Sequence, residues 1–397
     1  MYPNRIINRL KSAFMAVVLP LAGSVMPGAL LIMTAAPVTA QAGATSRRTE
    51  IRNEYPIYTV AQDYVRVFRY PDPPAKPREN VTLKNNVHFT SHYLINPVLA
   101  GSQWAQANLE YALVAGNRSF QSLTLATAPR IFQDIYMNRL IAARGTILDF
   151  SNSIFSNVQL NSAIIPGVNL SHISANLSGF SYAFLSHGKA NSFKAYNSGF
   201  NGVDWINADI NDAIFSYCGM DGARFSLSRM QNCFFENVTG KGTQYSGSDL
   251  TNSRWRNFNI DGAFMLPVQA QCTDGNSYLY VPSLRSAILQ DGSAINVDAR
   301  GADLRNSRWV RVNMISMDLR GADLRGMSIE DCMVTGANIY GAQIDAKLRK
   351  IMLANGAIEK AYEDNPVQAL DGASLAISTI KVYEKKCPSP SLKPAQP

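Results

Sequence analysis

Large apolar or aromatic side chains recur at every fifth position from Phe150 to Met265. The row holds 24 positions without a change of phase, and twenty of them are large. An α-helix repeats every 3.6 residues and a strand every 2, so neither element produces this period. A chain that turns a corner every five residues does. The four smaller members of the row are Ala175, Ala190, Ala195 and Gly240.

Small residues dominate the positions two before each member of this row. The exceptions are the large residues Leu148, Ile173, Phe193 and Phe258. Two of them accompany a small residue in the main row, since Ile173 precedes Ala175 and Phe193 precedes Ala195. A close-packed interior favours such an exchange of volume. Both rows are therefore predicted to point into one core.

A second row with the same period runs from Leu289 to Ile344. The step from Met265 to Leu289 is not a multiple of five, so the two rows differ in phase. We therefore expect a first repeat block at 148–265, a loop or hairpin extruded at 266–286, and a second block at 287–344.

The repeat unit itself resembles that of a known family. Residues 302–305 and 322–325 read Ala-Asp-Leu-Arg, 337–339 read Ala-Asn-Ile, and 208–210 read Ala-Asp-Ile. These segments resemble the A-(D/N)-L-x-x unit of pentapeptide-repeat proteins. The resemblance implies an all-β fold, a right-handed quadrilateral β-helix with four units per coil, and hence six coils followed by three. At about 4.8 Å per coil, nine coils would stack to about 43 Å.

A solenoid needs caps at its ends. Residues 127–147 are predicted to be a helical N-terminal cap, because a threonine and a proline precede an apolar stripe. Residues 345–387 are predicted to be a C-terminal cap whose helix begins at Asp345 and stops at Asn355-Gly356. The stripe of the N-terminal cap consists of Ile131, Ile135, Leu140 and Ile141.

The flanking segments are less regular. Residues 43–126 are expected to form an N-terminal accessory region, with a strand at 64–70 and a proline-rich linker at 71–77. The proline-rich tail at 388–397 is expected to be disordered.

Residues 1–42 have the order of a bacterial secretory signal peptide. A basic start with Arg5, Arg9 and Lys11 precedes an apolar stretch, and small-residue cleavage motifs follow at 38–40 and 40–42. An uncleaved membrane anchor is the alternative, since the apolar stretch is long enough to span. We expect a periplasmic or secreted protein.

Charge excludes some partners. The chain has 37 basic and 29 acidic residues, and it keeps a net charge of +5 once the three basic residues of the signal are removed. So small and dispersed a charge does not predict nucleic-acid binding. Contact with a membrane is expected only through an uncleaved signal or a weakly basic surface.

The second block contains the best candidate for an interaction face. Arg300 and Arg320 are twenty residues apart, as are Arg305 and Arg325, so each pair should stack on one side of a four-sided coil. Two pairs of aspartates should stack beside them. These side chains could form a charged docking surface, or a ladder of exposed salt bridges that contributes little to stability. The aspartates are Asp303 with Asp323, and Asp298 with Asp318.

Histidines and cysteines do not predict a metal site. His88 and His92 have a suitable spacing, but no third ligand is evident, and His172 and His187 fall at outward positions. Cys218, Cys233 and Cys332 occupy the small inward row and are expected to fill the core. The two cysteines outside the repeats, Cys272 and Cys387, are candidates to pair with each other.

No nucleophile elbow, P-loop, zinc-protease motif or dinucleotide fingerprint occurs. We therefore expect no enzyme, no catalytic residue and no cofactor. The leading hypothesis is a protein-binding or scaffolding module of the bacterial cell envelope, as a subunit of a larger envelope or secretion assembly or as a homo-oligomer. One alternative comes from the family, some of whose members resemble DNA and act on topoisomerases, but this needs an acidic surface. The other is an exported effector with its activity in residues 43–126.

Overall fold

The computed structural model describes residues 58–59, 78–79, 81–95, 97–99, 103–115, 121–122, 130–142, 146–271 and 277–361. The chain divides into Met1–Pro37 and Val38–Pro397, and all described residues belong to the second unit. The expected signal peptide, the strand at 64–70, the tail, Cys272 and Cys387 lie outside the described residues. Within the described part, no helix is both long and apolar enough to cross a membrane.

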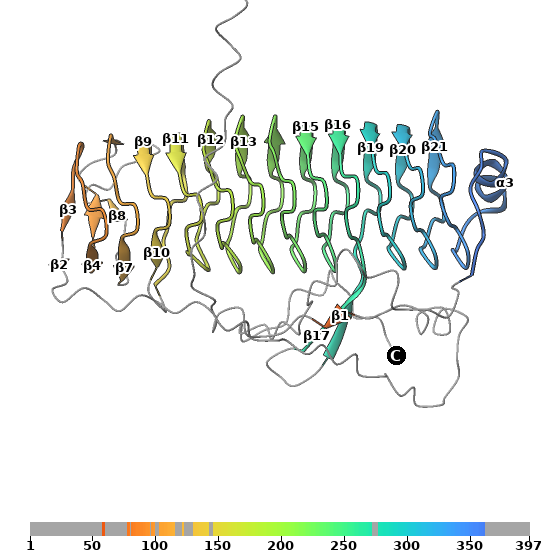
Figure 1. Ribbon diagram of the computed structural model, residues 1–397, viewed down its shortest axis with the longest axis horizontal. Helices are drawn as coiled ribbons and strands as arrows, with labels where there is room; N and C mark the ends of the chain where they lie inside the picture. Colours follow the sequence, from red (N-terminus) through yellow and green to blue (C-terminus); the bar gives the residue numbers. More distant parts are fainter. Residues whose placement is uncertain are drawn as a thin grey trace, which may run out of the picture. The chain divides into compact units, whose positions relative to one another are not determined.

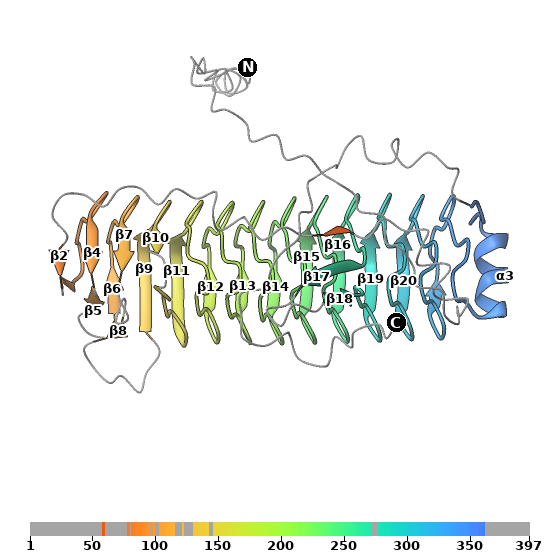
Figure 2. The same ribbon diagram turned by 90° about the horizontal axis from the view of Figure 1, so that it is seen from below.

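The described residues form a β-solenoid whose successive coils stack along one axis (Figures 1 and 2). One side of the stack is a sheet of eleven parallel strands. Through most of it, paired residues are twenty apart, as in Ala175 with Ala195 and Ala195 with Phe215. The predicted all-β, β-helical fold is confirmed. The strands are β6 (Gln103–Ala105), β9 (Arg130–Tyr136), β11 (Ser153–Gln159), β12 (Ser174–Asn176), β13 (Lys194–Tyr196), β14 (Ile214–Ser216), β15 (Phe234–Thr239), β16 (Arg254–Asn259), β19 (Ile288–Ser293), β20 (Arg308–Asn313) and β21 (Ser328–Glu330).

Each coil turns four corners. The residue two positions after each core residue has a positive φ, near 50–70°, as at Asn197, Gly202, Asn207 and Asp212. Glycine tolerates this left-handed conformation, and Asn and Asp adopt it more readily than other residues, which explains why they recur at the corners. Four corners in twenty residues make the coil four-sided. We number the faces one to four by the core residues of one coil, Ala195, Phe200, Trp205 and Ile210; face one is the eleven-stranded sheet.

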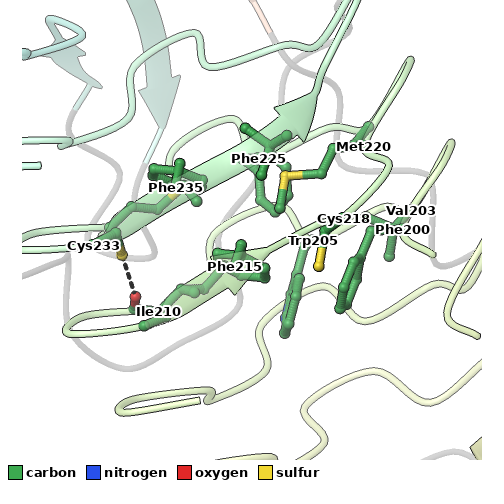
Figure 3. Packing of buried hydrophobic residues seen from close by; sticks show 14 of the residues in the cluster. Phe200, Val203, Trp205, Ile210, Phe215, Cys218, Met220, Phe225, Cys233 and Phe235 are labelled. Atoms are coloured by element: carbon green, nitrogen blue, oxygen red, sulfur yellow. Dashed lines mark hydrogen bonds between the residues drawn. The ribbon is translucent and has the colours of Figure 1, made fainter. Parts of the chain in front are cut away.

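Both inward rows are buried in a continuous core (Figure 3). Aromatic rings twenty residues apart stack on each other, with centroids 5.4 Å apart for Phe215 and Phe235 and 3.8 Å apart for Phe235 and Trp255. Phe193 is fully buried beside Ala195, and its ring lies 5.9 Å from that of Trp205. The large residue of the minor row thus occupies the volume that Ala195 leaves.

The coils begin well before residue 148. Phe132 pairs with Phe155 and Trp104 with Phe132, and these offsets exceed the usual twenty by three and by eight. Extra residues between the coils therefore shift the phase of the repeat, which hides these coils from a search at a fixed period. At about 4.8 Å per coil, eleven strands correspond to about 53 Å, more than the about 43 Å of the nine predicted coils.

The prediction of a helical cap at 127–147 is wrong. The described residues of this segment contain strands β9 and β10 (Ile141–Ala142). Its apolar residues are spaced five apart, because Ile135 and Leu140 occupy the inward row two before Met137 and Ala142, and all four are buried. The corners at Asp134 and Arg139 have φ of 51° and 55°, as in later coils. Two consecutive five-residue units thus produce an apolar pattern that resembles a helical stripe.

Residues 78–122 also belong to the coils wherever they are described, so the separate accessory region predicted for 43–126 is not found there. Parallel pairs link the strands of this segment, and Leu94 and Val114 are fully buried. The strands are β2 (Arg78–Glu79), β3 (Thr82–Leu83), β4 (Tyr93–Ile95), β5 (Val98–Leu99), β7 (Leu113–Ala115) and β8 (Gln121–Ser122).

The interruption between the two predicted blocks is a hairpin, as expected. Strands β17 (Val268–Gln271) and β18 (Ser277–Tyr280) are antiparallel, and β1 (Tyr58–Thr59) pairs in parallel with β17. Between β16 and β19 the register passes from Trp255 to Leu289, fourteen positions more than one coil. The coil resumes at Ser283, which bridges Asp249, so the predicted boundary of 286 lies too far along the chain.

The C-terminal end is covered by a helix, α3 (Ala346–Ala354), as predicted. Leu348 and Met352 are its buried residues, and Gly356 with φ 92° follows its end. Asp345 precedes the helix in an extended conformation but makes no side-chain cap. Its carboxylate instead accepts a hydrogen bond from the backbone NH of Gly326, at 2.7 Å. Residues beyond 361 in the predicted cap lie outside the described part.

Candidate interaction surface

The arginine and aspartate residues of the second block stack as predicted. Asp298 bridges Asp318 on face three, and Asp303 bridges Asp323 on face four, each in parallel register. In each repeat unit the aspartate precedes the core residue and the arginine follows it. Residues two apart on an extended segment point to the same side, which brings the two charges together.

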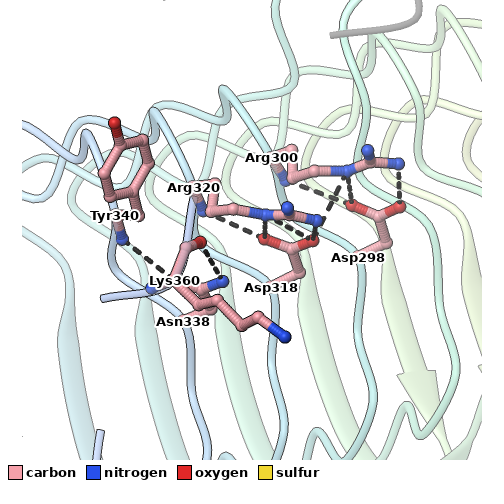
Figure 4. Close-up of polar contacts among 7 residues, drawn as sticks. All are labelled: Asp298, Arg300, Asp318, Arg320, Asn338, Tyr340 and Lys360. Carbon is pink, nitrogen blue, oxygen red and sulfur yellow. Dashed lines mark hydrogen bonds and ion pairs between the residues drawn. The ribbon is translucent and has the colours of Figure 1, made fainter. Parts of the chain in front are cut away.

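Each arginine binds the aspartate of its own unit through at least two hydrogen bonds; Figure 4 shows Arg300 with Asp298 and Arg320 with Asp318. Arg300 donates from Nε to Asp298 Oδ1 at 2.8 Å and from Nη2 to Oδ2 at 2.7 Å. Arg305 binds Asp303 with the same geometry, at 2.8 and 2.6 Å. Paired, charge-assisted bonds of this kind fix the guanidinium plane. The charged groups are therefore held in a defined geometry, not mobile.

The same pattern repeats one coil later, and weaker contacts link the coils. Arg320 pairs with Asp318 and Arg325 with Asp323. Between coils, Arg305 Nε lies 3.6 Å from Asp323 Oδ2. Arg300 Nε lies at the same distance from the Asp318 carboxylate one coil on.

The ladder is not uniformly exposed, contrary to the alternative we considered. Arg300 is only 3% exposed and Asp323 is also buried, whereas the side chains of Arg305 and Arg325 are 32% and 50% exposed. The column on face four therefore presents its arginines to solvent, and the one on face three mostly does not. That these charged side chains form a docking surface stays a prediction.

Electrostatics at Asp323 combine opposing effects. Burial raises the pKa of its carboxyl, but hydrogen bonds from Arg325 and the charges of Arg325 and Arg305 outweigh burial, and the net pKa lies below the ordinary value. The hydrogen bond to Asp303 raises the pKa of Arg305 further. Both groups stay ionised at neutral pH.

The first block contains ion pairs that the sequence reasoning missed. Arg224 binds the buried Asp204, and Arg229 binds Asp209, across adjacent coils. Ser186 Oγ also donates to Asp204, at 3.0 Å. Burial raises the pKa of the Asp204 carboxyl, although Arg224 and Ser186 lower it. The signal was present: each aspartate and arginine stand twenty residues apart at the same position of the repeat.

The histidines do not form a metal cluster: in the described part of the chain no group of three or more potential ligands occurs. His88 is exposed, and a ring nitrogen of His92 lies 2.8 Å from the carbonyl oxygen of Thr90. His172 and His187 are corner residues with φ of 58° and 62°.

Cys218 and Cys233 fill the core, as predicted. Burial raises the pKa of the Cys218 thiol to about 11 and that of Cys233 to about 12, so neither is a thiolate at neutral pH. The Cys233 thiol donates to the carbonyl oxygen of Ile210 at 2.9 Å (Figure 3). Cys332 is a free thiol that is only partly buried.

Four-sided coils built from five-residue units define a class of β-solenoid. Residues 300–336 match the family model described as pentapeptide repeats, in eight copies, so this part of the chain consists of pentapeptide repeats. No curated protein matches the chain.

Several solved structures are similar to the chain. HetL, a pentapeptide-repeat protein from the cyanobacterium Nostoc sp. strain PCC 7120, is 16% identical, with 70% of this chain and 94% of HetL covered and a TM-score of 0.23. QnrB1, a plasmid-mediated fluoroquinolone resistance protein, is 16% identical over 52% of this chain and 95% of its own, with a TM-score of 0.24. At such TM-scores neither likeness supports a conclusion about function.

Proposed function

We propose that the protein is a non-catalytic, protein-binding scaffold of the bacterial cell envelope, acting as a subunit of a larger envelope or secretion assembly. The observation behind this proposal is the ordered charge on face four. Arg305 and Arg325 stand one coil apart, each fixed by two hydrogen bonds and each partly exposed.

A fixed guanidinium suits protein recognition. Because Asp303 and Asp323 already hold the arginines in place, a partner binds them without the loss of much side-chain entropy. The remaining N–H groups of each guanidinium can donate hydrogen bonds to a carboxylate of a second protein. We therefore propose that the partner presents acidic side chains at a spacing close to that of the coils.

The compartment rests on the N-terminal sequence. Its basic start, apolar stretch and small-residue motifs support export to the periplasm or beyond. Cell fractionation of the native protein tests this: we expect a processed form in the periplasmic or secreted fraction. A full-length cytoplasmic protein would refute it.

Capture from envelope extracts tests the binding role. The full chain should retain a stable partner at native expression, and Arg305→Gln with Arg325→Gln should lose it. Arg311→Gln is the matched control, since Arg311 is also half-exposed and paired with an aspartate, Asp291, but lies on another face. If all three proteins retain the same partner, the face-four surface is not the docking site; if none retains one, the scaffold role fails.

A further inference from the structure

Four large apolar residues between Phe150 and Met265 occupy corners, where the backbone is left-handed. They are Leu177, Tyr182, Tyr217 and Leu227, with φ of 53°, 59°, 54° and 62°. This conformation costs a bulky L-residue about 1–2 kcal/mol, and Gly, Asn and Asp tolerate it better. A large side chain at such a position is therefore expected to gain something in return.

For Leu227 the cost of the corner conformation is offset by burial of its side chain. It is 3% exposed, although it stands at an outer corner. A Cβ placed on Gly247 would lie 2.9 Å from Leu227 Cδ2, 3.2 Å from Tyr280 Cβ and 3.3 Å from Val268 Cβ. The hairpin β17–β18 thus packs on Leu227, with only the glycine between them.

Among the described residues the other three stay far more exposed, although the Tyr182 ring lies against Gly202 of the next coil, where an added Cβ would lie 2.6 Å from Tyr182 Cδ1. Leu177 is 58% exposed, Tyr182 71% and Tyr217 63%. Each combines exposed apolar surface with a disfavoured backbone conformation. Such strain and exposure together are typical of a site that contacts a ligand.

All three side chains lie along the edges of face two. Leu177 and Tyr217 stand at the corner between faces one and two, and Tyr182 stands at the corner between faces two and three. Between these edges the parallel bridges from Gly179 to Gly199 and from Gly199 to Gly219 cross three successive coils. We call this area the tyrosine-edged strip; its floor comprises Gly179, Gly199, Gly219, Ser181, Asn201 and Asp221.

The floor is flat because its glycines leave room for polar side chains of the preceding coil. A Cβ on Gly199 would lie 3.2 Å from Ser181 Oγ, and one on Gly219 would lie 3.0 Å from Asn201 Oδ1. Below the floor, the buried rings of Phe180 and Phe200 stack with centroids 4.9 Å apart and planes 2° apart. The strip is therefore rigid before any ligand binds.

The chemistry of the strip is polar in the middle and apolar at the edges. Asn201 and Asp221 are exposed, and Asn201 Oδ1 accepts the backbone NH of Asp221 at 2.9 Å, which leaves the amide of Asn201 as a donor. In the same column Lys241 and Asp261 follow Asp221, so the charges nearly cancel. There is no excess positive charge to hold an acidic partner.

We propose that the tyrosine-edged strip binds a neutral, extended polysaccharide of β-linked pyranose units that runs along the solenoid axis. The C–H faces of sugar rings pack on tyrosine rings, and their hydroxyls bond to amide and carboxylate groups. Coils repeat every 4.8 Å or so, close to the advance of one sugar unit in such a chain. The proposal goes beyond protein binding and is independent of it.

A protein partner suits the strip less well. Protein interfaces have an apolar centre surrounded by a polar rim. Here the order is reversed, with Gly, Ser, Asn and Asp in the centre and Leu177, Tyr182 and Tyr217 at the edges. A polysaccharide, with hydroxyls along its length and C–H faces between them, is complementary to this arrangement.

Calorimetric titration of the full chain with chitohexaose, a neutral β-1,4-linked hexasaccharide, tests the proposal. We expect wild-type protein to bind and the triple variant Leu177→Asn, Tyr182→Asn, Tyr217→Asn to bind at least about tenfold more weakly. The unfolding temperature of the variant should stay the same or rise, because asparagine adopts the corner conformation readily. A merely structural role would lower it.

Leu227→Asn is the matched control. It changes the same kind of corner, so it should lower the unfolding temperature and leave chitohexaose affinity unchanged. The proposal is overturned if wild-type protein binds neither chitohexaose nor cellohexaose, if the triple variant binds as well as wild type, or if that variant unfolds as early as Leu227→Asn. Loss of a captured protein by the triple variant, without glycan binding by wild type, would assign the strip to a protein partner instead.

Discussion

At the scale of single residues, two requirements recur in every unit: an inward side chain of the right volume and a corner that accepts a positive φ. The first is visible in the sequence, because core residues keep a period of five. The second explains the Asn, Gly and Asp residues two positions later, such as Asn197 and Gly202. Exceptions at corners are informative: contact with the hairpin compensates Leu227, whereas Leu177, Tyr182 and Tyr217 stay mostly exposed.

Gly222 allows the corner requirement to be measured alone. Its φ is 66°, and a Cβ at this position would meet nothing within 4 Å. Gly222→Ala should therefore lower the free energy of unfolding by about 1 kcal/mol through backbone strain without any clash. Gly222→Asn should cost less. Denaturant titration of both variants checks the order; equal stability of the alanine variant and wild type would contradict it.

Asp323 makes stability depend on acid pH. Its folded pKa lies below the ordinary value because Arg325 and Arg305 outweigh burial. The stabilisation is therefore complete above the ordinary carboxyl pKa, near 4, and is lost as the pH falls through the lower folded pKa. Asp323→Asn should be less stable than wild type by about 1–3 kcal/mol at pH 7, and this gap should narrow at acid pH. Unfolding measured from pH 7 down to pH 3 tests it; a constant gap would count against this account.

At the scale of elements, the sequence predicted a coil wherever the period stayed fixed. The eleven-stranded sheet through β11–β16 and β19–β21, the hairpin and helix α3 were all expected. The N-terminal coils were not, because the steps from Trp104 to Phe132 and from Phe132 to Phe155 are both longer than twenty and change the phase twice. A search that lets the phase reset after each insertion would find them, since Asp134 and Arg139 still mark corners.

The candidate site was predictable in part. Stacking of Arg305 on Arg325 follows from a spacing of twenty residues, which the sequence shows. Burial of Arg300 does not, because it depends on what packs outside the coil. The strip on face two was missed, since Leu177, Tyr182 and Tyr217 are unusual only once the left-handed backbone at corners is known.

Removal of the hairpin should leave the coils intact. The step from Trp255 to Leu289 exceeds one coil by fourteen positions, the length of segment 267–280. Deletion of that segment, with Val281→Gly to suit the new corner, restores the twenty-residue step. The β-type circular dichroism spectrum should persist, while exposure of Leu227 lowers the free energy of unfolding by about 2 kcal/mol. Where the deletion protein folds, adding Leu227→Asn should cause no further loss in the free energy of unfolding, because Leu227 is already exposed. A deletion protein without β structure would instead show that the hairpin is required for folding.

At the scale of the whole solenoid, each coil is stabilised by the two beside it, so the ends are the weak points. Helix α3 covers the C-terminal end with Leu348 and Met352. Asn338 Nδ2 also donates to the carbonyl oxygen of Lys360 at 2.8 Å, which ties the last described residues to the final coil.

Disruption of this cap should loosen coils in order of their distance from it. Met352→Asp places a charge in a buried site and should detach α3. Hydrogen exchange should then quicken strongly in β21, less in β20, and hardly in β12. Ile351→Asp, on the exposed side of the same helix, is the control and should change little. Uniform acceleration along the chain would mean that the solenoid unfolds as one unit instead.

The parallel hydrogen bonds between coils run along the stacking axis, and this has a mechanical consequence. Tension between the two ends would open one ring of bonds at a time, because the chain pulls the end coil from one point and loads its bonds in sequence, whereas inner coils share the same force over a whole ring. Each event would release about twenty residues, or roughly 7 nm of chain, and the coil with the hairpin would release fourteen more, or roughly 12 nm in all. The molecule would therefore lengthen under load in small steps of nearly equal size.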